Sequence, residues 1–79
     1  MKSYQQLAEM TGATIDEVRT MMRNAHKVYE PRCVNYGEYA MVAVWRVGNA
    51  ATGCIGSGYT RETAVVYALE NNLQYAKIL

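Results

Sequence analysis

The sequence predicts a small α+β domain with two N-terminal helices, a small antiparallel sheet of 2–3 strands, and one C-terminal helix packed on that sheet. Three observations predict this class. Apolar residues recur at helical spacing near both ends of the chain. The middle of the chain holds a run rich in valine, tyrosine and tryptophan, which favour strands. A Gly-Asn pair follows that run and is typical of a hairpin turn.

The chain has 79 residues, enough for a single domain with one small core. The expected organisation is a helical hairpin over residues 3–30, antiparallel strands over 32–59 and a helix over 60–79. Chains of this length bury only about 60% of the surface that they expose when unfolded, so oligomerisation is a common supplement to their stability. We therefore expect a homodimer that closes through the strands.

Two capping boxes mark the starts of the N-terminal helices. Residues 3–6 begin the first helix, which is expected over about 4–10, and Gly12 can end it in the left-handed conformation. Residues 14–17 begin the second helix, expected over 15–28. Helical spacing predicts that the buried sides contain Leu7, Met10, Ile15, Val18, Met21, Met22, Ala25, Val28 and Tyr29.

The longest apolar run, residues 39–47, is broken only by Arg46 and is apolar on both faces of the expected strand. Such a strand must pack against other residues on both faces. The helices can cover one face, and a partner can cover the other. A turn at 47–49 leads into a return strand, where several glycines suggest a bulge. Thr60 can then cap the last helix.

The second helix is expected to carry a basic side. Four of the eight Lys and Arg residues lie within fourteen positions, and three of them recur every fourth residue. A ridge of positive side chains can bind the phosphates of a nucleic acid. The alternative is that this side of the helix faces only solvent, with Asp16 paired to Arg19. The candidate nucleic-acid-binding residues are Arg19, Thr20, Arg23, Lys27 and Arg32.

Residues 5–24, QQLAEMTGATIDEVRTMMRN, resemble the helix-turn-helix of bacterial and phage repressors. The resemblance implies that the second helix enters the DNA major groove. Asp16 and Glu17 depart from the family pattern, because they place two acids at the end that faces the groove. The matching positions are Leu7, Ala8, Gly12, Ala13, Val18 and Met21.

Residues 56–73, GSGYTRETAVVYALENNL, are similar to the end of the double-stranded-RNA-binding domain. That resemblance implies a three-stranded sheet followed by a packed helix. Glu62 and Val65 replace two of the three lysines that hold phosphates in the family. The chain can therefore share the sheet and helix of this family without its RNA binding. The matching positions are Gly56, Gly58, Thr60, Arg61, Ala64 and Ala68.

The aromatic composition suggests a second kind of surface. The chain has seven tyrosines and no phenylalanine. Tyrosine combines a large apolar body with a polar tip and is enriched at protein interfaces. An ordinary core that uses tyrosine for its aromatic layer is the alternative. The candidate protein-interface residues are Tyr36, Tyr39, Trp45 and Tyr59.

Other features argue against catalysis and bound metal. One histidine and two cysteines, Cys33 and Cys54, lack the spacing of zinc ligands, so no metal, no cofactor and no small-molecule substrate are expected. The N-terminus lacks the pattern of a signal peptide, and no apolar run approaches the length of a membrane span. These features favour a cytoplasmic protein with reduced thiols and no membrane partner.

The sequence thus predicts a small non-catalytic binding protein. The first expectation is a DNA- or nucleoprotein-binding regulator that uses the basic face of helix 15–28. The alternative is an inhibitor of the compact kind that phages and mobile elements encode, such as anti-CRISPR proteins. That inhibitor would block a host complex through its tyrosine-rich surface.

Overall fold

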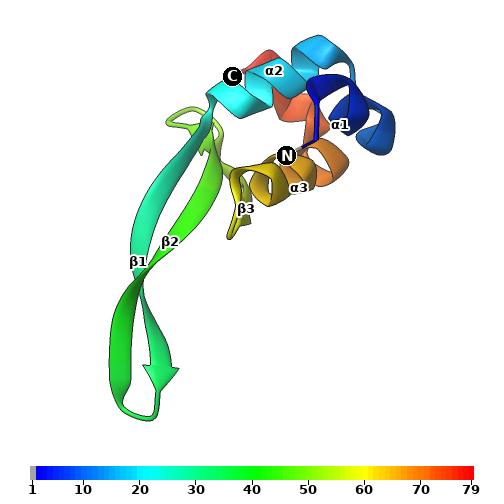
Figure 1. Cartoon of the computed structure of the whole chain (residues 1–79). Helices are drawn as coiled ribbons and strands as arrows, with labels where there is room; N and C mark the ends of the chain where they lie inside the picture. Colours follow the sequence, from blue (N-terminus) through cyan, green and yellow to red (C-terminus); the bar gives the residue numbers. More distant parts are fainter. Residues whose placement is uncertain (1) are drawn as a thin grey trace.

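The structure, a computed structural model, describes residues 2–79 and confirms the α+β class (Figure 1). Two N-terminal helices precede a three-stranded antiparallel sheet of order β1-β2-β3, and a third helix packs on that sheet. The elements are α1 (Tyr4–Thr11), α2 (Ile15–Arg23), β1 (Ala25–Asn35), β2 (Glu38–Asn49), β3 (Gly53–Gly58), α3 (Arg61–Asn71) and a 3₁₀-helix, η1 (Leu73–Lys77).

Both predicted capping boxes are present. The Ser3 hydroxyl accepts a hydrogen bond from the Gln6 amide at 3.1 Å, and the Thr14 hydroxyl accepts one from the Glu17 amide at 3.1 Å. In each case the N3 side chain bonds back to the amide of the cap residue. Gly12 ends α1 with a φ of 73°, which is the left-handed conformation expected there.

Met10 and Ile15 are more exposed than predicted, at 51% and 44%. Helix α1 is buried along the i, i+3, i+4, i+7 row that starts at Tyr4, and Met10 lies outside this row. Ile15 is the first residue of α2 and lies at the exposed end of the helix. The prediction that these two side chains point inward is therefore wrong.

The second helix ends at Arg23 and not at Val28, so it is five residues shorter than predicted. The predicted helical hairpin over 3–30 is therefore wrong beyond residue 24. Asn24 closes the helix, because its side-chain amide donates to the Thr20 carbonyl at 2.8 Å. The next residues form β1, which begins at Ala25 and pairs along its length with β2. Pairing with β2 overrides the local helical spacing.

Strands β1 and β2 form a long hairpin, whereas β3 pairs only with residues 45–49 of β2. The expected turn between β2 and β3 is present, and the Asn49 side chain accepts hydrogen bonds there from the amides of Ala51 and Thr52 at 2.9 Å. The expected bulge is present too. The register shifts between Val47 and Gly48, which leaves Ile55 without a partner on β2.

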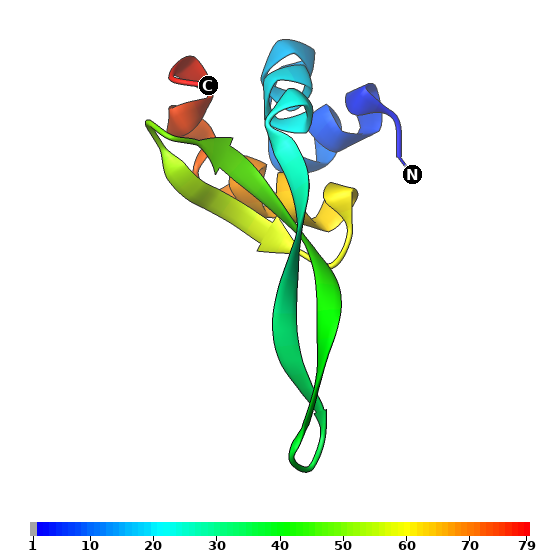
Figure 2. The same cartoon turned by 90° about the vertical axis from the view of Figure 1, so that its left-hand side faces the viewer.

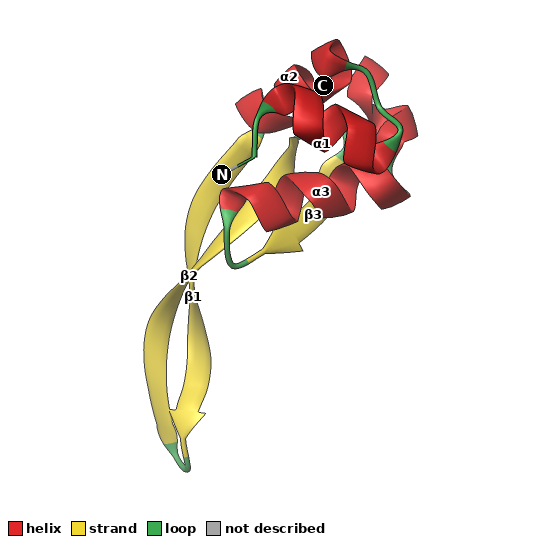
Figure 3. Ribbon diagram, turned by 45° about the vertical axis from the view of Figure 1, so that its right-hand side comes forward, coloured by secondary structure: helices red, strands yellow, loops and turns green. Residues whose placement is uncertain are grey.

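The core lies between the three helices and one face of the sheet (Figure 3). Helix α3 ends at Asn71, earlier than the helix predicted over 60–79, because the Asn72 side chain donates to the Ile55 carbonyl at 2.8 Å. The buried apolar side chains of this core are Leu7, Ala8, Val18, Met21, Met22, Val47, Ile55, Ala64, Val65, Ala68 and Leu69.

Beyond the end of β3, the β1–β2 hairpin leaves the core and projects as an arm, defined here as residues 28–44 (Figure 2). The molecule is 44 Å long, and its radius of gyration is 13.7 Å. A compact chain of this length has a radius of gyration of about 11.6 Å. The helices thus cover the apolar run 39–47 only at its body end, so Tyr39 and Met41 lack the helical cover expected for one face of this strand.

Gly56 sets the distance between β3 and α3. A Cβ atom at this position would lie 2.5 Å from the Ala64 carbonyl oxygen and 2.8 Å from the Ala68 Cβ. We expect Gly56→Ala to lower the free energy of unfolding by about 1–3 kcal/mol, because α3 must move off the sheet. Urea denaturation measures this, with Ser57→Ala, at the exposed next residue, as the matched control. Equal midpoints for the two variants would contradict the prediction.

Candidate binding surface

The predicted basic ridge is not continuous. Arg19 and Arg23 lie on α2, whereas Lys27 and Arg32 lie on β1. Thr20 is half-buried on α2. The break follows from the early end of α2, because residues beyond Asn24 alternate between two faces of a strand.

Two of these cations already have carboxylate partners. The Arg19 guanidinium lies 2.7 Å from an oxygen of Asp16, which is the pairing that the solvated-face alternative expected. The Arg32 guanidinium lies 2.8 Å from Glu30, and the other carboxylate oxygen of Glu30 contacts Arg46. Glu30 therefore offsets positive charge on its face of the arm.

Trp45 lies at the junction of the arm and the body. The Lys27 Nζ is 5.5 Å from the centre of its ring, and the Arg61 Cζ is 5.8 Å from it. Arg61 also donates to the carbonyl of Met22 at the end of α2, at 2.6 Å. Trp45 is half-buried, so it connects α2, α3 and the hairpin and is less available to a partner than predicted.

The other three predicted interface residues are exposed. Tyr36 is fully exposed in the turn at the tip of the arm, where Gly37 has a φ of 77°. Tyr39 is 73% exposed on β2, and Tyr59 is 67% exposed just after β3. Tyr36 and Tyr39 thus both lie on the arm. Tyr59 follows β3, which ends before the arm begins.

The arm carries further exposed apolar side chains that the sequence reasoning missed. Tyr29 and Met41 are 62% and 63% exposed, and Val34 is 52% exposed. Tyr29 pairs with Ala43, and Met41 pairs with Pro31, so these residues share the broad face that includes Trp45. Helical spacing predicts Tyr29 on a buried side of the second helix, but the β-branched and aromatic residues after Asn24 are a signal that indicates a strand.

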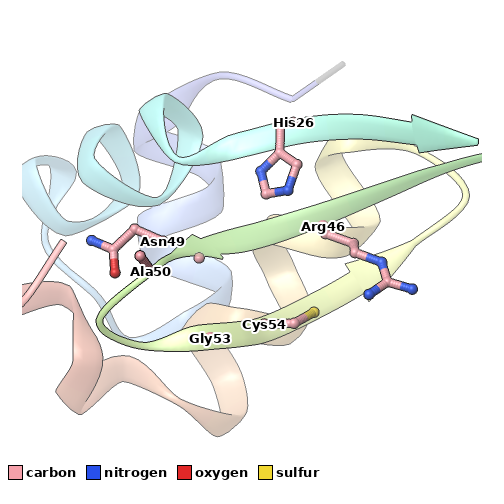
Figure 4. Close-up of a pocket in the computed structure, with 7 residues that line it drawn as sticks. His26, Arg46, Asn49, Ala50, Gly53 and Cys54 are labelled. Carbon is pink, nitrogen blue, oxygen red and sulfur yellow. The ribbon is translucent and has the colours of Figure 1, made fainter.

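A shallow hollow of about 360 Å³ lies on the sheet face opposite the helices (Figure 4). Cys54, next to the bulge in β3, lines this hollow from one outer strand, and His26 lines it from the other. No Asp or Glu is among the described residues that line it, so His26 has no carboxylate there to orient it. The lining residues are His26, Arg46, Gly48, Asn49, Ala50, Gly53 and Cys54.

Neither cysteine is in a disulfide; both Cys33 and Cys54 are exposed free thiols. Over residues 2–79, no group of three or more His, Cys, Asp or Glu side chains could hold a metal ion. No helix in this range is long and apolar enough to cross a membrane.

The arm is therefore the most distinctive surface of the protein, since it combines exposed aromatic side chains with a position outside the core.

Comparisons of the chain with protein-family models, with curated proteins and with solved structures found no match in any of the three.

Proposed function

We propose that this protein is a non-catalytic binding protein that recognises a partner protein through its arm, residues 28–44. One observation carries the proposal. Ten large apolar side chains are exposed in the described part of the chain, and five of them, Tyr29, Val34, Tyr36, Tyr39 and Met41, lie within the arm. Exposed apolar residues gathered on one projecting element mark an interaction site, whereas scattered ones need no explanation.

The charge of the arm favours a protein over a nucleic acid. Its charged residues are one arginine, Arg32, and two glutamates, Glu30 and Glu38, which gives a net charge of −1. Affinity for nucleic acid comes largely from cations that neutralise phosphates. Aromatic residues and methionine, by contrast, are enriched at protein interfaces.

The mode of action that fits such an arm is occlusion. A narrow ribbon can enter a groove of its target and cover a functional surface there, as expected for a compact inhibitor. The two free thiols suit a reducing compartment such as the cytoplasm, which is where we place this activity.

DNA binding by α2 is the second candidate. Its specific support is that α1 and α2 are short helices joined by residues 12–14, a turn of the length and glycine content typical of a helix-turn-helix. Arg23 at the end of α2 is exposed. Duplex DNA that shifts with the parent at low salt, and not with a variant carrying Arg19→Ala and Arg23→Ala, would favour this candidate over the first.

The proposed function is tested by capture of partners from a lysate of the cells that encode the protein. We expect the parent to retain one stoichiometric protein, and a variant with Tyr39→Asp and Met41→Asp to lose it, because two charges on the exposed face prevent its desolvation. Tyr67→Asp is the matched control, since Tyr67 is a 53% exposed tyrosine on α3. Equal capture by all three proteins would exclude the arm as the binding site.

A further inference from the structure

The backbone of β2 has an open edge along the arm. The Gly48 amide donates to the Asn24 carbonyl at 3.2 Å, which places even-numbered residues of β2 in hydrogen bonds with β1. In an antiparallel pair these bonds alternate, so the amides and carbonyls of odd-numbered residues point the other way. At Trp45 and Val47 they face β3, whereas at Tyr39, Met41 and Ala43 they face an edge that β3 does not reach.

The outer edge of β1 is closed by contrast. Pro31 is opposite Met41, so by the same alternation its nitrogen lies on the outer side of the hairpin. A proline there has no N–H group to donate to an added strand, and it is one device by which edge strands avoid pairing. The arm thus has one blocked edge and one edge that can accept a further strand.

The open edge is complementary to itself. Two copies of β2 in antiparallel pairing about Met41 place Tyr39 opposite Ala43 of the second copy, a large side chain against a small one. Met41 faces Met41 of the second copy, and the pairing supplies about six backbone hydrogen bonds. Residues 39–43 carry no charge, and the neighbouring Glu38 lies about 20 Å from its equivalent in the second copy, so no like charges meet.

We propose that this protein forms a homodimer in which the open edge of β2 over residues 39–43 pairs with the same edge of a second copy. The two arms become a four-stranded antiparallel ribbon. The inference goes beyond the proposed function, because it concerns the edge of the arm, whose broad faces stay available to a partner protein.

Sedimentation equilibrium of the purified protein tests the pairing. We expect the parent to be a dimer, and Met41→Lys and Met41→Glu each to raise its dissociation constant by about a hundredfold or more, because like charges then meet on the two-fold axis. An equimolar mixture of the two variants should restore a dimer. Tyr29→Lys is the matched control, since it places a charge on the same face but on β1, and it should dimerise as the parent does.

A second variant tests the backbone. Ala43→Pro removes an N–H from the open edge while keeping the β1–β2 ladder, as Pro31 does on the other strand, so it should be a folded monomer by circular dichroism. A dimer of Ala43→Pro with the affinity of the parent would overturn the inference, as would a monomeric parent or charge variants that dimerise like the parent. A monomeric parent that still captures a protein would overturn the dimer alone and leave the proposed function standing.

Discussion

Replacing residues 31–41 by Asn-Gly is expected to leave the body of the protein folded and to abolish partner capture. Glu30 and Val42 are paired across the hairpin, so a two-residue turn can join them without a change of register. None of the buried side chains of the described chain lies between residues 31 and 41. Most of the exposed apolar surface of the arm lies in this segment.

The free energy of unfolding of this shortened chain, from urea denaturation, should stay within about 1 kcal/mol of the parent value, because the removed residues contribute no core packing. Tyr36→Asn is the control for turn chemistry, since it creates the same Asn-Gly pair at the natural tip and keeps the full length of the arm. A shortened chain that fails to fold would show that the arm stabilises the body. One that folds and still captures the partner would exclude the arm as its binding site.

The parts of the fold that the sequence predicts are those decided within a few residues. Both capping boxes depend on side chains three positions apart, and the left-handed turn depends on Gly12 alone. Helix α3 likewise buries Ala64, Val65, Ala68 and Leu69, whose helical spacing can be read from the sequence, because a helix positions its own repeating face.

The boundary between α2 and β1 could not be predicted in the same way. Ala25, Val28 and Tyr29 continue the helical spacing of α2, and they suit a strand equally well. The choice is made by β2, the next strand along the chain, which pairs with every residue from Ala25 to Cys33 and lies up to 22 positions away from its partners. The error extends to the site, because the basic ridge depended on a helix that continues to Lys27.

The extent of the arm depends on another long-range feature, the length of β3. The apolar run 39–47 predicts a strand with two covered faces, but β3 is six residues long and pairs only with the body end of that run. Residues 38–41 of β2 are consequently exposed. Half of the exposed large apolar side chains thus lie on the arm, a segment that the sequence pattern predicts to be covered.

Leu7→Ala is expected to destabilise the protein by about 2–5 kcal/mol, the range for large-to-small changes at buried positions. Leu7 is completely buried, in the core that joins α1 to α2, α3 and the sheet. A chain of 79 residues has a total stability of about 4–12 kcal/mol, so the loss is a large fraction of the whole.

Met10→Ala is the matched control for Leu7→Ala, because Met10 lies three residues later on the same helix and is 51% exposed. Its effect should be about 0.5 kcal/mol or less, since little packing is lost and alanine favours the helix. Urea denaturation followed by circular dichroism measures both variants against the parent. Because α1 packs through Leu7 and not through Met10, the two variants should lose different amounts of unfolding free energy. An equal loss for both would mean that α1 packs through a different face.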